Sequence, residues 1–477
     1  MLFNSFAYAV FLPTVFILYW GMQERPLREQ NLLLLAANYV FYGWWDYRFL
    51  LLLIANCLVD YGTALWLERE ERDGKRRFVV LISLVANLGV LGFFKYYGFF
   101  VDSFARLLEM FGLRPNIHSL HIILPVGVSF YTFQSLSYTI DVYRRRMSPT
   151  HDLIGFLTFH SFFPQLVAGP IERASDLLPQ ILRRRSLDLD QAADGLRQML
   201  WGLFKKVVIA DRMAPHVEHV FNNYATLGGV DLIFGTYLFA IQIYCDFSGY
   251  TDIAIGTARL LGFRLTRNFA YPYFSRDMAE FWHRWHITLS TWFRDYVYIP
   301  LGGNRGPRWF AIRNVVLTFV ISGLWHGANW TYVAWGLLNG LYYAPIMLAN
   351  RQHRYTEVVA AGRLLPSPRE ALQIASTFSL TLVAWVFFRA DSLASAVSFL
   401  GGWVSRPWLV ESFANYARPI LVTLVVLGVE WVQREKPHGL AIGEFRPALR
   451  WATYYALALA IFAFGDTGNV PFIYFQF

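Results

Sequence analysis

Histidines set among uncharged, aromatic side chains are the residues of this chain whose type and position point to proton-transfer chemistry. His326 lies in residues 322–336 (SGLWHGANWTYVAWG), which carry no charged side chain. A neutral imidazole can accept or release a proton around neutrality. Gly327 leaves space beside the ring for a substrate, and Trp325 and Trp330 are positioned in the sequence to exclude water. The interpretation is a general base, with a histidine hydrogen-bonded in helix packing as the alternative.

A second histidine cluster has the spacing of a metal site without its usual motif. On a helix, Glu280, His283 and His286 recur every three residues and lie near one face. The zincin pattern HExxH and the repeated histidine boxes of membrane di-iron enzymes are both absent. His216 and His219 form another pair with no third ligand in the sequence around them. We therefore predict no metal.

Two acidic residues stand in a third segment, residues 244–256 (YCDFSGYTDIAIG). Asp246 and Asp252 close an apolar helix that begins near Leu232. Acidic side chains within a membrane usually face a cavity or a charged partner. The alternative is a helix broken at Ser248 and Gly249, with both acids at the interface and paired with nearby arginines.

The elements that must position these residues are membrane helices. Of the 477 residues, 56% are hydrophobic and only 16% are charged, against about 25% charged in soluble domains. Since about 20 helical residues cross the hydrocarbon core, we predict an all-α polytopic membrane protein with about 10–12 embedded helices. The apolar runs are residues 1–23, 31–45, 78–94, 122–140, 312–349 with a break near His326, 371–388, 419–429 and 451–464.

Other compositional features narrow the class further. The first run lacks a basic start and a small-residue cleavage site, so we expect it to be retained. Cys57 and Cys245 are too few and too far apart for a disulfide framework or a metal site. The net charge of +9 is explained by basic cytoplasmic loops, so no nucleic acid partner is expected.

Basic residues also predict the orientation of the chain. The connections after the first, third and fifth helices hold ten Lys and Arg, and the alternate connections hold four. The positive-inside rule then places the N-terminus outside the membrane. The ten are Arg25, Arg28, Arg69, Arg72, Lys75, Arg76, Arg77, Arg144, Arg145 and Arg146, and the four are Arg48, Lys95, Arg106 and Arg114.

Residues 259–313 combine nine arginines with many Trp, Phe and Tyr and contain no full-length apolar run. This composition is typical of interfacial or re-entrant helices. We expect this region to form a cytoplasmic floor under the membrane helices and, with them, a central tunnel.

Four sequence blocks together resemble one family. They are FFPQLVAGPIER at residues 162–173, CDFSGYTDIAIG at 245–256, RWHITLSTWFRDYVYIPLGG at 284–303 and SGLWHGANWTYVAWG at 322–336. They resemble the membrane-bound O-acyltransferases, in particular the bacterial branch that acetylates polysaccharides such as alginate. The start MLFNSFAYAVFLP and the end PFIYFQF are similar too, so the resemblance predicts a single domain over residues 1–477. We divide it into N-terminal helices (1–145), a catalytic core (146–345) and C-terminal helices (346–477).

The resemblance implies roles for individual residues. The histidine of the LWHG block is catalytic in that family and maps onto His326, and the histidine of the RWHI block maps onto His286 as the second functional residue. His283 inherits no role. The weaker candidates for substrate or donor binding are Asp246, Trp325, Asn329, Trp330, Arg284 and Arg294.

The implied reaction is transfer of an acetyl group from cytoplasmic acetyl-CoA to a hydroxyl, with no bound cofactor and no metal. Arginines of the basic floor would suit the phosphates of coenzyme A. The expected location is the bacterial inner membrane. The expected partners are a periplasmic acetyltransferase resembling SGNH hydrolases, the exopolysaccharide synthesis machinery and membrane lipid. The alternatives are a transporter or flippase without covalent chemistry, an inert scaffold, and a relative that uses a carrier-protein thioester.

Overall fold

The computed structural model describes residues 1–113, 120, 122–167, 169–408, 413–465 and 472–473. Arg114, Ala168 of the FFPQLVAGPIER block, and all of the PFIYFQF block except Phe472 and Ile473 lie outside these residues. Every regular element in the described part of the chain is a helix, as the hydropathy predicted.

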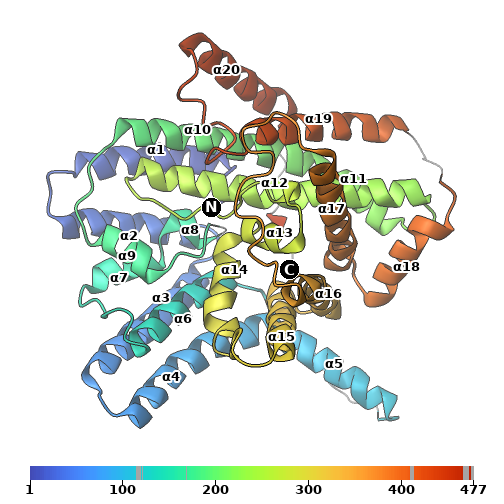
Figure 1. The fold of residues 1–477 in the computed structure, drawn as a ribbon. Coiled ribbons are helices and arrows are strands. Elements are labelled where there is room, and N and C mark those ends of the chain that lie inside the picture. The colour runs from blue at the N-terminus through green and yellow to red at the C-terminus, as the bar shows by residue number, and fades with distance from the viewer. Residues whose placement is uncertain (114–119, 121, 168, 409–412, 466–471, 474–477) are drawn as a thin grey trace. The chain divides into compact units, whose positions relative to one another are not determined.

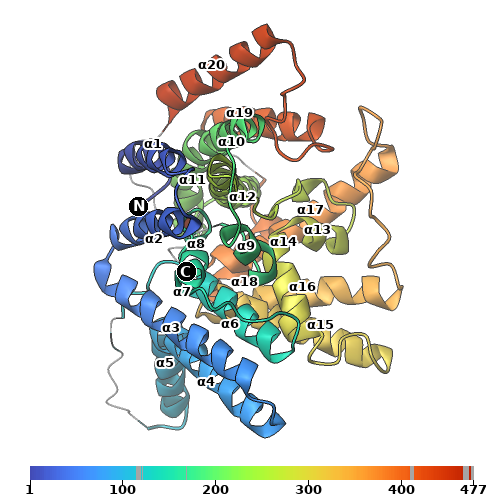
Figure 2. The ribbon, with the colours of Figure 1, turned by 90° about the vertical axis from the view of Figure 1, so that its left-hand side faces the viewer.

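Figures 1 and 2 show the helices in their order along the chain. The α-helices are α1 Phe6–Gly21, α2 Leu27–Gly43, α3 Tyr47–Arg69, α4 Asp73–Leu91, α5 Tyr97–Met110, α6 Val128–Tyr143, α7 Leu153–His160, α8 Phe163–Leu166, α9 Ala174–Ile181, α10 Leu189–Phe204, α11 Asp211–Asn222, α12 Gly229–Leu260, α13 Met278–Arg284, α14 Ile287–Phe293, α15 Arg308–His326, α16 Trp330–Leu348, α17 Pro368–Arg389, α18 Leu393–Ser405, α19 Phe413–Val432 and α20 Pro447–Phe464. The π-helices are η1 Gly92–Tyr96, η2 Lys205–Ala210 and η4 Arg294–Tyr298, and η3 Pro272–Phe274 is a 3₁₀ helix.

Six helical stretches of the described chain are long and apolar enough to cross a membrane. They are Tyr47–Arg69, Asp73–Met110, Gly229–Leu260, Arg308–His326, Pro368–Arg389 and Pro447–Phe464. Phe6–Gly21, Leu153–Leu166 and Leu393–Ser405 are apolar but shorter. The protein is therefore a multi-pass membrane protein. The region predicted to be interfacial contains the seven-residue helices α13 and α14, which are too short to span a bilayer.

The chain forms two compact units, Met1–Ala192 with Ala258–Leu265, and Ala193–Thr257 with Thr266–Phe477. The three-part division of the sequence into residues 1–145, 146–345 and 346–477 stays a prediction.

In the first unit, α3, α4 and α6 pack on one another, with α3 and α4 side by side (Figure 2). Their shared interior contains a small polar network. Asp60 accepts hydrogen bonds from the Ser83 hydroxyl at 2.6 Å and from the Asn87 amide at 2.9 Å. These bonds satisfy one oxygen, Oδ1, of a carboxyl group that the helices remove entirely from solvent.

In the second unit, α12 runs without interruption for 32 residues. The predicted alternative of a break at Ser248 and Gly249 is therefore wrong. Gly249 serves close packing, because a Cβ atom built there would lie 2.7 Å from the carbonyl oxygen of Gly202 on α10. The small residue lets two helix backbones meet, as small residues do at helix interfaces in membranes.

Helices α15 and α16 form an antiparallel hairpin and lie side by side (Figure 1). The break between them falls at residues 327–329, as the sequence predicted around His326. Three glycines allow the two backbones to touch. Cβ atoms built at Gly323, Gly336 and Gly340 would lie 2.1 Å from Tyr332 O, 2.3 Å from Phe319 O and 2.9 Å from Val316 Cα. The hairpin thereby fixes the position of the residue at its turn, His326.

Candidate functional site

His326 is the last residue of α15, at the turn of the α15–α16 hairpin. Helix α16 begins directly after Asn329, whose side-chain oxygen accepts a hydrogen bond from the Thr331 amide at 3.1 Å and caps the helix. A Cβ atom at Gly327 would lie 2.0 Å from the Tyr332 ring. The space that Gly327 leaves is therefore filled by Tyr332, and no side chain larger than hydrogen fits this turn as it stands.

Aromatic rings surround the His326 imidazole, which is 3% exposed. Ring centroids of Trp325, Trp335 and Phe388 lie 4.9, 5.0 and 5.3 Å away, each edge-on to the imidazole. Trp325 thus lies where the sequence analysis expected a wall against water. Trp330 is 54% exposed, and Trp335 one turn further along α16 contacts the ring.

Two cavities of the second unit are lined by residues close to His326 in the sequence, one by residues that follow it and the other by residues that precede it. One, of about 470 Å³, is lined by Gly327, Ala328 and Asn329, the three residues that follow His326. The other, of about 310 Å³, is lined by Val315, Thr318, Phe319 and Ser322 of α15. Because residues four apart share a helix face, His326 continues the face that ends at Ser322.

The larger cavity is polar. Side chains of Glu218, Gln242, Tyr332, Arg389 and Asp391 line it together with Asn329. The Asn329 amide nitrogen donates to the Asp391 carbonyl at 3.0 Å, so both ends of this amide hold backbone in place. Carboxylate, amide, phenol and guanidinium groups together suit a ligand rich in hydroxyl groups.

The smaller cavity has mainly apolar walls, with a few polar groups at its edge. Trp282, Phe293 and Phe319 line it, with Arg294 and His283. Arg294 is 59% exposed at its side chain and pairs with Asp295 at 2.7 Å. The cavity suits a long ligand with apolar parts and an anionic group.

His286 does not share a helix with Glu280 and His283, and the predicted three-residue periodicity is wrong. Helix α13 ends at Arg284, and His286 adopts a left-handed conformation with φ of 43° before α14. That conformation costs about 1–2 kcal/mol for a residue with a Cβ atom, so tertiary contacts must hold it. Within the described residues, no group of three or more His, Cys, Asp or Glu is placed to hold a metal ion.

The His286 ring is fully buried. Its Nδ1 lies 3.1 Å from the side-chain oxygen of Asn268. The rings of Phe247 and Trp325 pack edge-on against it at 4.7 and 6.3 Å. Burial lowers the pKa of His286 from its ordinary value of 6.5 to about 3. The imidazole is therefore neutral at physiological pH, and it shares Trp325 as a packing partner with His326.

The two acids of α12 pair with lysines of the π-helix η2, so the predicted alternative of arginine partners is wrong. Asp246 lies 2.8 Å from Lys206, which also contacts Asp211 at 2.7 Å. Asp252 lies 2.7 Å from Lys205. A buried charge is tolerated when it is paired and hydrogen-bonded, and these contacts supply both conditions.

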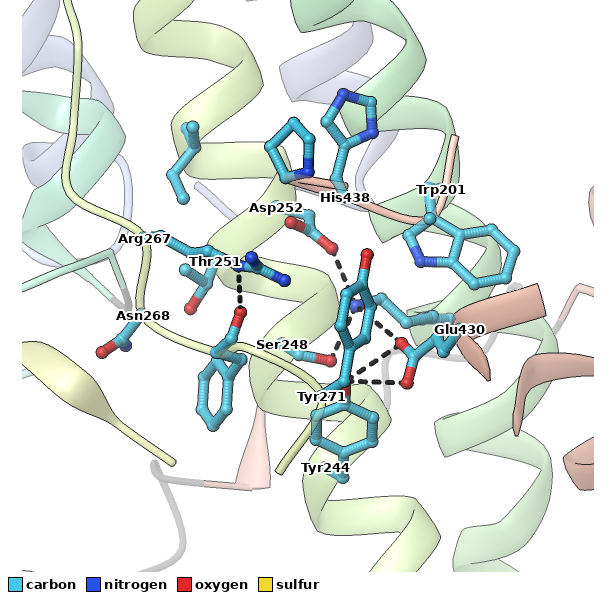
Figure 3. A pocket seen from close by; sticks show the side chains of 15 residues that line it. Trp201, Tyr244, Ser248, Thr251, Asp252, Arg267, Asn268, Tyr271, Glu430 and His438 are labelled. Atoms are coloured by element: carbon cyan, nitrogen blue, oxygen red, sulfur yellow. Dashed lines mark hydrogen bonds and ion pairs between the residues drawn. The ribbon is translucent and has the colours of Figure 1, made fainter. Parts of the chain in front are cut away.

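A small polar cavity of about 20 Å³ lies among Ser248, Asp252 and Glu430 (Figure 3). Lys205 also lines it. Its ammonium donates to the Ser248 hydroxyl at 2.8 Å and lies 3.9 Å from Glu430. Glu430 in turn accepts from the Tyr244 hydroxyl at 2.9 Å. Asn268, the partner of His286, lines the same cavity. Sequence analysis missed Lys205, Glu430 and Asn268, although the Lys205-Lys206 pair inside an apolar run was a usable signal.

Two arginines, Arg284 and Arg294, were predicted from the sequence as binding residues. Arg284 forms its contacts with other residues of the second unit. It lies 2.9 Å from Glu280 and donates to the carbonyl groups of Ala270 and Glu357 at 3.2 and 3.3 Å. Arg294 is the more exposed and lines the apolar cavity.

Comparison with known proteins agrees with the four sequence blocks. The model of the membrane-bound O-acyltransferase family matches residues 143–374. The chain is 43% identical over 399 residues to a probable alginate O-acetylase of Pseudomonas aeruginosa. The matched region covers 83% of this chain and 73% of the relative. It is 36% identical over 438 residues to a peptidoglycan O-acetyltransferase of Helicobacter pylori, covering 85% and 80%.

A teichoic acid D-alanyltransferase of Streptococcus thermophilus is 28% identical over 315 residues, 61% of this chain and 75% of the relative. The resemblance drawn from the sequence blocks is confirmed: the chain belongs to the membrane-bound O-acyltransferase family and is an O-acyltransferase.

Proposed function

We propose that the protein transfers acetyl groups from acetyl-CoA to a hydroxyl for O-acetylation of an exopolysaccharide of the alginate type, with His326 as the general base. The observation that carries the proposal is the position of His326 in the chain, between residues that line a polar cavity and residues that line an apolar one. The similarity to alginate and peptidoglycan O-acetylases supports the choice of acetyl group and polymer.

In the proposed reaction, a nitrogen of His326 removes the proton of the acceptor hydroxyl. The oxygen forms a bond to the acetyl carbonyl carbon, the tetrahedral intermediate collapses, and the carbon–sulfur bond breaks. The leaving thiolate takes the proton back from His326. Proton transfer by a positioned base contributes about 10²–10⁴-fold to such rates. Packing by Trp325, Trp335 and Phe388 supports this role, because excluding water protects the thioester from hydrolysis.

The two cavities suit the two substrates. The apolar cavity with Arg294 fits the pantetheine arm and a phosphate of coenzyme A, and the polar cavity fits a sugar or a partner side chain that carries the hydroxyl. Under this proposal the donor arrives from the cytoplasm and the acceptor from outside the inner membrane. A periplasmic acetyltransferase and the polymer synthesis machinery are the partners that the scheme requires.

The test is acetyl transfer from radiolabelled acetyl-CoA in membranes of cells that make the polymer. We expect His326→Gln to lower coenzyme A release and labelling by at least about 10²-fold. His160→Gln is the matched control, since it replaces another fully buried imidazole, one hydrogen-bonded to Ser135 in the first unit. Both variants must reach the membrane in normal amounts.

Near-normal turnover of His326→Gln would remove this residue from the mechanism. An intact thioester with the wild-type protein would favour a transporter. Label found on a protein or on the polymer identifies the immediate acceptor.

A further inference from the structure

Asn268 contacts three consecutive residues of the turn that contains His286. Its carbonyl oxygen accepts from the Ile287 amide at 2.9 Å. Its side-chain oxygen accepts from the Thr288 amide at 3.3 Å and the Thr288 hydroxyl at 3.0 Å. The same oxygen lies 3.1 Å from His286 Nδ1. One buried residue thus holds His286 in the left-handed conformation, which a residue with a Cβ atom otherwise disfavours.

These contacts decide the orientation of the Asn268 amide. The backbone N–H of Thr288 can only donate, so the amide atom that faces it must be the oxygen. The amide nitrogen then points away from Thr288, and among the described residues it has no hydrogen-bond partner. Asn268 also lines the polar cavity of about 20 Å³, a volume that holds one water molecule.

The orientation of the amide in turn decides the tautomer of His286. An oxygen that faces Nδ1 requires a proton on Nδ1, because a carbonyl oxygen cannot donate. A neutral imidazole carries one N–H, so Nε2 bears a lone pair. We infer that Asn268 is a positioning residue that locks His286 in the Nδ1–H form, so that Nε2 can act only as a hydrogen-bond acceptor.

This inference gives His286 a role different from that of His326. The portion of the inference that concerns catalysis rests on the proposed function. A neutral Nδ1–H imidazole cannot donate from Nε2 to an oxyanion, so His286 is no oxyanion donor. Its Nε2 lone pair can only accept a hydrogen bond during the reaction. The lowered pKa agrees with a ring that stays neutral while it does so.

Other charges near His286 are already paired. Beside Phe247, Asp246 of α12 pairs with Lys206. Arg267, next to Asn268, donates to the Phe269 carbonyl at 2.7 Å, and Arg284 of α13 pairs with Glu280. His326 of α15 lies beyond Trp325. None of these groups takes the place of Asn268 at Nδ1.

The direct test is ¹⁵N NMR of the full-length protein labelled at histidine nitrogens in lipid. Subtracting the spectrum of His286→Gln from that of the wild type identifies the His286 signals. We expect a protonated Nδ1 and an unprotonated Nε2, unchanged from pH 8 to pH 5. A protonated Nε2 would overturn the inference. This measurement requires no activity, so it stands even if the proposed function fails.

Asn268→Asp supplies a second test. Aspartate keeps an acceptor oxygen at the same place and adds a negative charge beside Nδ1. A nearby opposite charge moves a pKa by about 1–3 units, here upward. Starting from about 3 in the wild type, this shift gives a pKa of about 4–6. We expect the His286 signals of the variant to titrate between pH 7 and 4, with kcat/KM gaining an acidic limb in the same range. Asn38→Asp is the control, a buried asparagine whose oxygen also accepts from a backbone amide, that of Phe163.

One outcome of the Asn268→Asp experiment would contradict the inference. His286 signals and a pH–rate profile that coincide with the wild type would show that Asn268 does not govern the ring. If Asn268→Asp fails to fold, the wild-type spectrum alone decides.

Discussion

Trp325 packs against both histidines of the site, His326 and His286. Its indole packs against His326 at 4.9 Å and against His286 at 6.3 Å. The two imidazoles therefore share one aromatic wall while they differ in hydrogen bonding and backbone conformation. At the scale of residues, this difference supports the separate roles that we propose, a base and a hydrogen-bond acceptor.

The buried His286 should make folding stability depend on pH. Its pKa is about 3 in the folded protein and near 6.5 when unfolded. The contribution of neutral His286 to the free energy of unfolding is fully present above pH 6.5. It is lost as the pH falls from 6.5 toward 3, because in that range His286 binds a proton only in the unfolded state. One such proton corresponds to about 1.4 kcal/mol per pH unit in that range.

We therefore expect the thermal midpoint of the wild type to fall from pH 7.5 to pH 5 more steeply than that of His286→Gln. Intrinsic tryptophan fluorescence of the detergent-solubilised protein measures both. Parallel slopes for the two proteins would contradict the prediction.

At the scale of elements, the α15–α16 hairpin determines where His326 stands. Gly336 and Gly340 have the GxxxG spacing, and a Cβ atom at Gly336 would meet backbone atoms of Phe319 and Val320 within 3.0 Å. Backbone atoms cannot rotate aside as a side-chain tip does, so a methyl group must push the helices apart.

We expect Gly336→Ala to destabilise the protein by about 1–3 kcal/mol, the usual cost of overpacking. Turnover should fall by roughly 10²-fold, as a shift of about 1 Å in a reacting group can cost that much. Gly401→Ala on α18 is the control, because its Cβ atom has nothing within 4 Å. Equal behaviour of the two variants in melting and acetyl-transfer assays would show that the close helix contact does not position His326.

The elements also explain why the acids of α12 lie where they do. Asp246 and Asp252 face η2, where the consecutive lysines Lys205 and Lys206 each take one of them. π-helical turns interrupt the regular spacing of side chains and are frequent at functional sites. The alternative that the sequence left open, pairing with nearby arginines, is wrong because these two lysines are the partners.

At the scale of the whole molecule, the proposed reaction depends on orientation in the membrane. Ten basic residues against four predict the connection 69–77 inside the cell and the N-terminus outside. Both native cysteines are buried, so they give little background in a labelling experiment.

We expect Trp44→Cys, at a position 63% exposed, to react with a membrane-impermeant maleimide in intact cells. Glu71→Cys, also at an exposed position, should react only after the membrane is permeabilised. Labelling is read by mass shift on a gel. The reverse pattern would invert the topology and with it the side from which acetyl-CoA arrives.

Properties that depend on neighbours along the chain could be predicted from the amino-acid sequence. Apolar runs indicated a polytopic helical protein, the run at residues 312–349 was interrupted near His326, and four ordered blocks identified the family. The structure and the comparisons confirmed all three.

Contacts between residues far apart in the sequence could not be predicted in this way. The left-handed turn at His286 is stabilised by Asn268, 18 residues away, and Asp246 is neutralised by Lys206, 40 residues away. Such pairings depend on how helices pack, because a buried polar group takes whichever partner the packing brings within hydrogen-bond distance. Helical periodicity alone placed His286 on one face with Glu280, and the contacts of Asn268 are the physical reason that it lies elsewhere.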